Sequence, residues 1–106
     1  MKGFGGGMNE FVRQAARTQR RIEDAKKEIK DVEVSATAAD GKVTAVVTCE
    51  GRVVRIDVDP AFAAAEGLPM ALDASVAALN AALALADKAV DDAIAKVTNG
   101  IKLPGM

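Results

Sequence analysis

Two long stretches of this chain space their small and apolar residues alternately three and four positions apart. The first runs from Glu10 to about Asp31, and the second from Met70 to about Thr98. Because an α-helix turns about 100° per residue, each series falls on one face, as in a coiled-coil seam. The first series is Phe11, Ala15, Thr18, Ile22, Ala25, Ile29 and Val32. The second series is Leu72, Val76, Leu79, Leu83, Ala86, Val90, Ala93 and Val97. The sequence therefore predicts two long helices, and each of them needs a partner surface for its seam.

Three β-strands are predicted between the two helices. Residues 31–37 alternate apolar with polar side chains, and residues 42–49 and 52–58 are rich in β-branched residues. Asp40–Gly41 and Glu50–Gly51 are turn signals between these runs, the second weaker than the first. Turns this short join neighbouring strands, so the sequence predicts an antiparallel meander.

The sheet is followed by a short helix, in which Asp59 is the predicted N-cap and Pro60 the first helical residue, and which Gly67 ends. The fold class is therefore α+β, in the order long helix, three-stranded meander, short helix, long helix. At about 1.5 Å per residue the last helix is about 40 Å long, more than the width of three strands about 4.8 Å apart. Part of it must overhang the sheet, and the overhanging seam needs a helix from the same chain or from a second copy. We expect a homodimer in which exposed sheet edges join and helix pairs project.

The length of 106 residues suits one domain with a modest core. We expect residues 1–8 to form a flexible Gly-rich leader, because glycine loses much conformational entropy when it is ordered. Residues 9–98 form the predicted domain, with Asn9 as the cap of the first helix. Residues 99–106 form a predicted loose tail.

The residue types present argue against several classes of function. The chain has one cysteine and no histidine, which excludes an internal disulfide, a Cys/His zinc site and a Cys–His nucleophile. Cys49 is expected to be a small buried hydrophobe in a reducing cytosol. Asp73 and Asn80 interrupt the most apolar stretch, so no membrane-spanning helix is predicted. We therefore predict no enzyme, no metal or other cofactor, no small-molecule substrate and no membrane partner.

Positive charge is concentrated in the first predicted helix. Residues 1–30 carry eight Lys and Arg against four Asp and Glu, although the whole chain has a formal net charge of −1. Such a helix is often only a solvated face, and Glu10, Asp24 and Glu28 are placed to neutralise it. The stretch 13–21 holds four arginines and no acid, which favours phosphate contact, because the planar guanidinium group suits phosphate oxygens.

The order of these segments resembles the YbaB/EbfC family of bacterial nucleoid-associated proteins over nearly the whole chain. A Gly-rich leader precedes "QAARTQRRIEDAKKEI", which runs into "EVSATAADGKVTAVVTCEGRVVRIDVDP" and later into a long helix and "NGIKLPGM". The resemblance implies small homodimers whose strands join across the two-fold axis, with helix pairs projecting like tweezers. It also implies binding of double-stranded DNA, often with little sequence preference, and a role in compacting or regulating the chromosome in the cytoplasmic nucleoid.

The last helix departs from that resemblance. Family members often carry several Arg and Lys along it, whereas here only Lys88 and Lys96 face three nearby aspartates. The predicted contact with DNA therefore falls on the first helix. The candidate DNA-binding residues are Arg13, Arg17, Arg20, Arg21, Lys27 and Lys30. The rival interpretation is a homodimeric scaffold whose helices dock a protein partner and never touch DNA.

Overall fold

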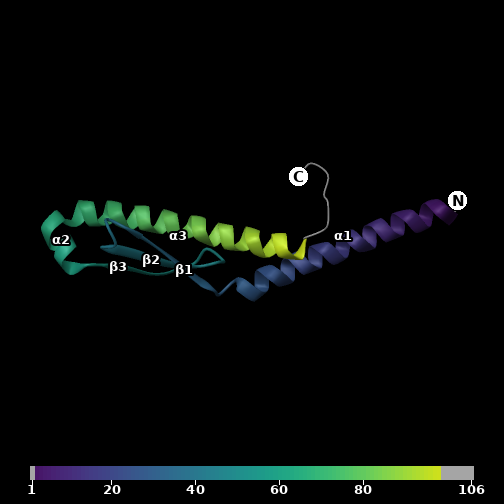
Figure 1. The fold of residues 1–106 in the computed structure, drawn as a ribbon, viewed down its shortest axis with the longest axis horizontal. Coiled ribbons are helices and arrows are strands. Elements are labelled where there is room, and N and C mark those ends of the chain that lie inside the picture. The colour runs from purple at the N-terminus through teal and green to yellow at the C-terminus, as the bar shows by residue number, and fades with distance from the viewer. Residues whose placement is uncertain (1, 99–106) are drawn as a thin grey trace.

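The computed structural model describes residues 2–98, with side chains from Gly7 onward, in a molecule that measures 76 × 24 × 19 Å. Its elements are α1 (Lys2–Ile29), β1 (Glu33–Ala38), β2 (Val43–Thr48), β3 (Val53–Val58), α2 (Pro60–Glu66) and α3 (Leu68–Val97). The sheet lies along one half of α3, and α1 crosses beside the C-terminal end of α3 and continues beyond it (Figure 1). The predicted α+β order is confirmed.

The three strands form an antiparallel meander in the order β1-β2-β3, as predicted. The β1–β2 turn contains Ala39, Asp40 and Gly41, all with positive φ, and the amide of Lys42 donates to the carbonyl of Ala39 at 3.1 Å. In the second turn Gly51 has φ of 93°, a conformation that glycine adopts without a steric penalty. A register shift beside Val46 leaves one extra residue in β3, typical of a β-bulge.

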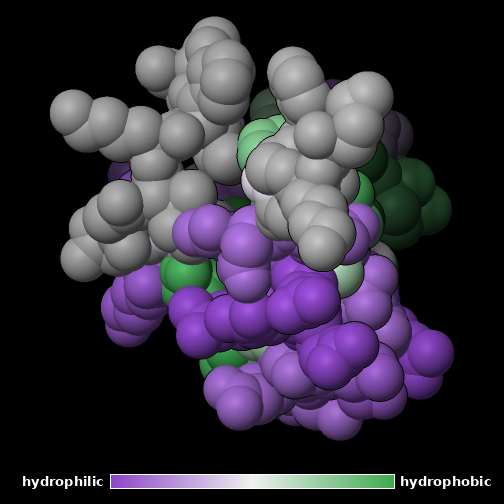
Figure 2. All heavy atoms as spheres, turned by 90° about the vertical axis from the view of Figure 1, so that its right-hand side faces the viewer, coloured by the Kyte–Doolittle hydropathy of each residue, from purple (hydrophilic) through white to green (hydrophobic). Residues whose placement is uncertain are grey.

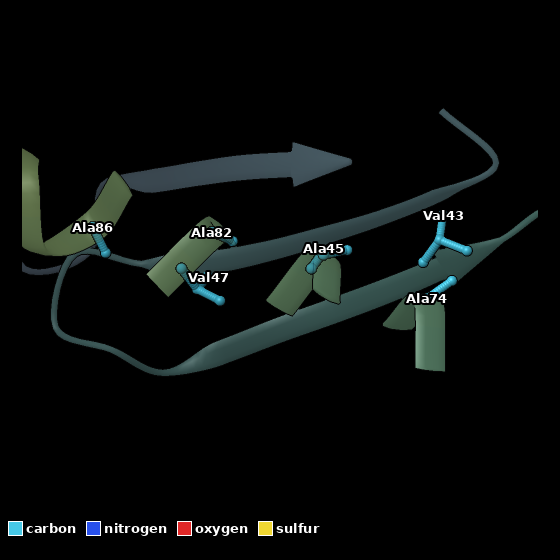
Figure 3. Close-up of a cluster of buried hydrophobic side chains, with 7 residues drawn as sticks. Val43, Ala45, Val47, Ala74, Ala82 and Ala86 are labelled. Carbon is cyan, nitrogen blue, oxygen red and sulfur yellow. The ribbon is translucent and has the colours of Figure 1, made fainter. Parts of the chain in front are cut away.

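The core lies where a stripe of alanines on α3 meets β2. Val43, Ala45 and Val47 are fully buried on the α3-facing side of the central strand. From α3 the buried residues are Ala71, Ala74, Ala78, Ala82 and Ala86. Figure 3 shows valine and alanine side chains of β2 close to alanines of α3. Because alanine ends at Cβ, the helix backbone approaches the sheet closely, and this compensates for the lack of large aromatic residues in the core.

The predicted seam of α3 is only partly covered within the chain. Leu72 and Val76, whose seam was expected to need a partner surface from the same chain or from a second copy, are 56% and 58% exposed. Leu79 and Leu83 are half-buried at the border of the core. The alanine stripe lies beside the predicted one on the helix and faces the sheet, because small side chains fit at the closest approach and the bulkier residues are left on the flank.

The predicted cap of α2 is confirmed. The carboxylate of Asp59 accepts a hydrogen bond from the amide of Ala61 at 2.8 Å, and Pro60 occupies the first turn. The amide of Gly67 donates to the carbonyl of Ala63 at 2.9 Å, which closes the helix. α2 thus turns the chain from the edge strand β3 back over the sheet as α3.

The start of α1 differs from the sequence prediction. A helix beginning after Asn9 was expected, but α1 begins at Lys2 and includes the glycines of the expected leader. Adding a residue to an existing helix costs far less than nucleating one, about 1 kcal/mol for a glycine relative to alanine. The amphipathic segment that follows nucleates the helix, which then extends toward the N-terminus. The predicted tail, residues 99–106, lies outside the described residues.

The overhanging part of α3 packs on α1 of the same chain. Ala25 is buried, and Ile22 and Ile29 are half-buried, whereas Phe11 and Ala15 farther toward the N-terminus are exposed. The first predicted seam is thus covered only in its second half. The projecting half of α1 has no partner within the described chain.

One helix of the described residues, α3, is long and apolar enough by composition to cross a membrane, with a mean hydropathy of 1.6 over its most apolar window. The sequence predicted no spanning helix because Asp73 and Asn80 interrupt the apolar stretch, and this test of length and composition tolerates such interruptions. Only 22% of that window is buried, so the alanines that pack on the sheet supply a minor part of its apolar character.

Candidate nucleic-acid interface

The four arginines of α1 occupy a band about 100° wide on the surface of the helix. At about 100° per residue, Arg13 and Arg20 point about 120° and about 140° away from buried Ala25, whereas Arg17 lies about 80° and Arg21 about 40° from it. All four side chains are exposed. Figure 2 views the molecule from the end at which α1 projects, and strongly hydrophilic side chains gather on one side of that end.

Three of these arginines have no acidic partner within the described residues. Arg13 lies 3.7 Å from Glu10, and both side chains are about two-thirds exposed, at 67% and 69%. Solvent screens such a pair, so it holds the guanidinium group only weakly. Between residues 7 and 98 no carboxylate lies within 4.0 Å of Arg17, Arg20 or Arg21, although Asp24 is one turn away on the same helix.

Two of the predicted lysines have different surroundings. Lys27 and Lys30 line a groove between α1 and α3 with a volume of about 600 Å³. The same groove is lined by Lys26, Cys49, Glu50, Asp87, Val90 and Asp91. Three acidic side chains therefore offset three lysines here. The structure separates the six candidate residues into an exposed arginine face (Arg13, Arg17, Arg20 and Arg21), in which only Arg13 has a described acidic partner, and two lysines beside acids.

α3 supplies little positive potential. Lys88 donates to the carboxylate of Asp92 at 3.2 Å, one turn away on the exposed side of the helix. Asp87 and Asp91 line the groove beside the lysines of α1. α3 therefore supports α1 by packing against it rather than by adding cations.

Nothing in the described part of the chain resembles a catalytic or metal centre. Residues 2–98 contain no group of three side chains suited to holding a metal ion. Cys49 is 6% exposed and lies at the end of β2, where it packs as the predicted small hydrophobe. Asp57 pairs with Arg55 at 3.0 Å on the polar side of β3, as expected for a solvated strand face.

Two apolar surfaces are exposed, one on an edge of the sheet, where the sequence analysis expected a dimer contact without choosing between the edges, and one on α1, which it did not identify as an interface. On β3, Val53, Val54 and Ile56 are 37% to 46% exposed. On the projecting half of α1, Met8, Phe11 and Val12 are 59% to 72% exposed. The apolar pattern placed Val54 and Ile56 on one face of their strand and Phe11 in the seam of its helix, but it did not show that these residues would be left uncovered.

Comparison with known proteins agrees with this arrangement. The model of the YbaB/EbfC DNA-binding family matches residues 4–101. A nucleoid-associated protein of Acetivibrio thermocellus is 37% identical over 98% of this chain and 93% of its own length. One from Myxococcus xanthus is 33% identical over 93% of this chain and 94% of its own.

The fold itself is found in a crystal structure of the uncharacterized protein HP0035 from Helicobacter pylori. The TM-score is 0.64 at 12% sequence identity, covering 79% of this chain and 88% of that one. The family model spans nearly all of the chain, including the arginine face of α1, the meander and α3. The chain belongs to the YbaB/EbfC DNA-binding family, which is a family of DNA-binding proteins and not of enzymes.

Proposed function

We propose that this chain is a nucleoid-associated protein of the bacterial cytoplasm that binds duplex DNA as a homodimer, with little sequence preference. The observation that supports this most is the exposed arginine face of α1. Arg17, Arg20 and Arg21 are exposed and lie beyond 4.0 Å of every described carboxylate. Guanidinium groups in this state give up little when they meet phosphates, because no internal ion pair has to be broken.

The mechanism is neutralisation of phosphates. Arg13, Arg17 and Arg20 recur about one helical turn apart, so their side chains follow a phosphate backbone instead of converging on one point. Each contact releases counterions condensed on the DNA, and this release supplies the affinity. Lys27 and Lys30 contribute less, because Asp87 and Asp91 line the same groove and offset their charge.

Sequence preference is expected to be low. α1 is joined to a β-strand rather than by a short turn to a second helix, so the described elements give it none of the helix-turn-helix support that fixes a recognition helix in the major groove. Among residues 7–98 Phe11 is the one exposed aromatic side chain, and Phe62 is half-buried against the core, so the described residues lack the row of rings on which successive unpaired bases stack. Contacts with the backbone alone carry no direct sequence information.

We infer that the dimer forms through β3. This strand is an edge of the sheet, and its outer N–H and C=O groups have no strand partner within the described chain. Ile56 is paired with Ala45 and therefore lies on the α3-facing side, but α3 lies over β1 and β2 and leaves it 37% exposed. A second β3 would extend both sheets and cover these apolar side chains. Two arginine faces would then act on one duplex.

Competition between unrelated duplexes tests the low specificity. Two 30-base-pair duplexes, one random and one rich in A·T pairs, are titrated at the same salt concentration. We expect dissociation constants that agree within about threefold, because a single mismatched contact to a base typically costs 1–3 kcal/mol and none is made here. A difference of 30-fold or more would mean that bases are read. No binding to either duplex near 50 mM salt would favour the protein scaffold.

A further inference from the structure

The apolar stripe of α1 continues past the point where α3 stops covering it. Ile22 and Ile29 are half-buried, whereas Phe11 is 72% exposed and Met8 65% exposed. Phe11 precedes Ile29 by about five turns, so both side chains point in the same direction from the helix axis. We name Met8, Phe11 and Val12 the apolar tip. Large apolar side chains that lie together and exposed form a patch of the kind that marks a binding site for a partner.

The apolar tip and the arginine face lie on opposite sides of α1. At about 100° per residue, the residues of the tip point about 40° to 140° to one side of buried Ala25. The four arginines point about 40° to 140° to its other side. A duplex that lies along the arginine face therefore leaves the tip pointing away from the DNA, open to a further molecule.

The surroundings of the tip are uncharged among the side chains from Gly7 onward. The exposed residues that border it are Asn9, Gln14, Ala15, Ala16 and Gln19. Glu10 and Arg13 point toward the arginine side and lie 3.7 Å from each other. Two copies can therefore meet tip to tip without bringing like charges together. An anionic membrane surface is a poorer match, because no described cation flanks the apolar side chains to meet the headgroups.

We propose that a second copy of this protein covers the tip, so that two copies, each bound to its own duplex, meet tip to tip and bridge the two DNA molecules. This arrangement depends on the proposed binding of DNA along the arginine face. From Gly7 to Arg17, α1 extends for about 15 Å, and its N-terminal half continues beyond the end of α3 (Figure 1). Two such segments can lie side by side, with Phe11 and Met8 of each copy against the other helix and both arginine faces turned outward.

A contact of this size is weak on its own, and this suits a bridging role. Stable interfaces contain about 20–30 residues on each side, far more than the tip offers. Free dimers at micromolar concentration therefore stay apart. Copies bound along two neighbouring duplexes present many tips at an effective concentration of the order of millimolar, and the weak contacts act together.

Recovery of a second duplex tests the proposal. A biotinylated duplex is held on beads, and a fluorescent duplex of the same length is added together with the protein near 100 mM salt. Phe11→Ser combined with Val12→Ser removes most of the tip. Asn9→Ser combined with Ala16→Ser is the matched control, because both residues are exposed and lie outside the tip and the arginine face. The control loses at least as much helix propensity, since alanine is the best helix former and Phe, Val and Ser are similar.

We expect the wild type and the control to recover at least tenfold more of the second duplex than the tip variant. All three proteins should bind a single duplex with dissociation constants that agree within threefold. Binding of one duplex without recovery of a second, or recovery that survives loss of the tip, would refute the bridging contact and leave DNA binding intact. No binding to a single duplex would refute both proposals. Lack of recovery together with tip-dependent cosedimentation with vesicles of phosphatidylglycerol and phosphatidylcholine would assign the tip to a membrane surface instead.

Discussion

Replacing Arg13, Arg17, Arg20 and Arg21 together by alanine is expected to weaken binding to duplex DNA by 100-fold or more at about 100 mM salt. The proposed dimer would lose eight phosphate contacts, and such contacts supply most of the affinity of a protein that does not read bases. Alanine has the highest helix propensity, so α1 should keep its helical structure. A gel shift with a random 30-base-pair duplex measures the loss, and circular dichroism checks the fold.

A matched pair of variants separates the arginine face from net charge. Arg17→Ala with Arg20→Ala removes two free cations, and Arg52→Ala with Lys88→Ala removes two cations that face Glu50 and Asp92 at 3.9 and 3.2 Å. We expect the first pair to weaken binding at least tenfold and the second by less than threefold. Equal losses would mean that only the overall charge matters. Wild-type affinity in the fourfold variant would rule out α1 as the DNA-binding element.

Changing Ile56 to aspartate is expected to convert the dimer into a monomer of 10.9 kDa. The substitution places a charge on the α3-facing side of edge strand β3, where a second copy would bury it without a partner, at a cost of several kcal/mol. In the isolated chain Ile56 is 37% exposed, so the fold itself should tolerate the change. Sedimentation velocity at 20 μM measures the mass directly.

Thr37→Asp is the matched control, because Thr37 is an exposed residue of β1, the other edge of the sheet. This variant is expected to remain a dimer. A monomer for Thr37→Asp together with a dimer for Ile56→Asp would move the interface to β1. A wild-type chain that sediments as a monomer would contradict the whole arrangement of two arginine faces on one duplex.

The meander and the short helix could be predicted because their signals are local. Asp40–Gly41 and Gly51 fix the turns through backbone conformations that few residue types adopt, and Asp59 caps α2 with its own side chain. Strand register follows from such turns, so the pairing of β1, β2 and β3 needed little information from distant residues. The order of the helices and strands along the chain could be predicted for the same reason, because each boundary has a local signal.

The packing of α3 could not be predicted in the same way. A helix with both an alanine stripe and a leucine and valine stripe is compatible with either of them facing the sheet, and hydrophobicity alone favours the larger residues. The closest approach of helix and sheet selects Ala78 and Ala82, which are fully buried, over Leu72 and Val76. That choice depends on shape, which the pattern of residue types does not contain.

The sequence could predict which helix carries the candidate interface. It could not predict which of its charged side chains would be free of ion pairs. The run of arginines without an acid in residues 13–21 is visible in the sequence. Whether Glu10, Asp24 and Glu28 would neutralise it depends on side-chain conformations, and only Glu10 lies within 4.0 Å of an arginine. Two of the three acids beside Lys27 and Lys30 lie on α3, more than 50 residues away in sequence, and no local pattern could indicate them.

The salt dependence of binding to a random duplex tests the central claim most directly. If four arginines of each subunit meet phosphates, a plot of log Kobs against log salt concentration should have a slope of about −7 for the dimer. The fourfold alanine variant should bring the slope close to zero, and the Ile56→Asp monomer should give about half of the wild-type value. A wild-type slope shallower than about −2, or a steep slope that survives removal of the four arginines, would contradict the account.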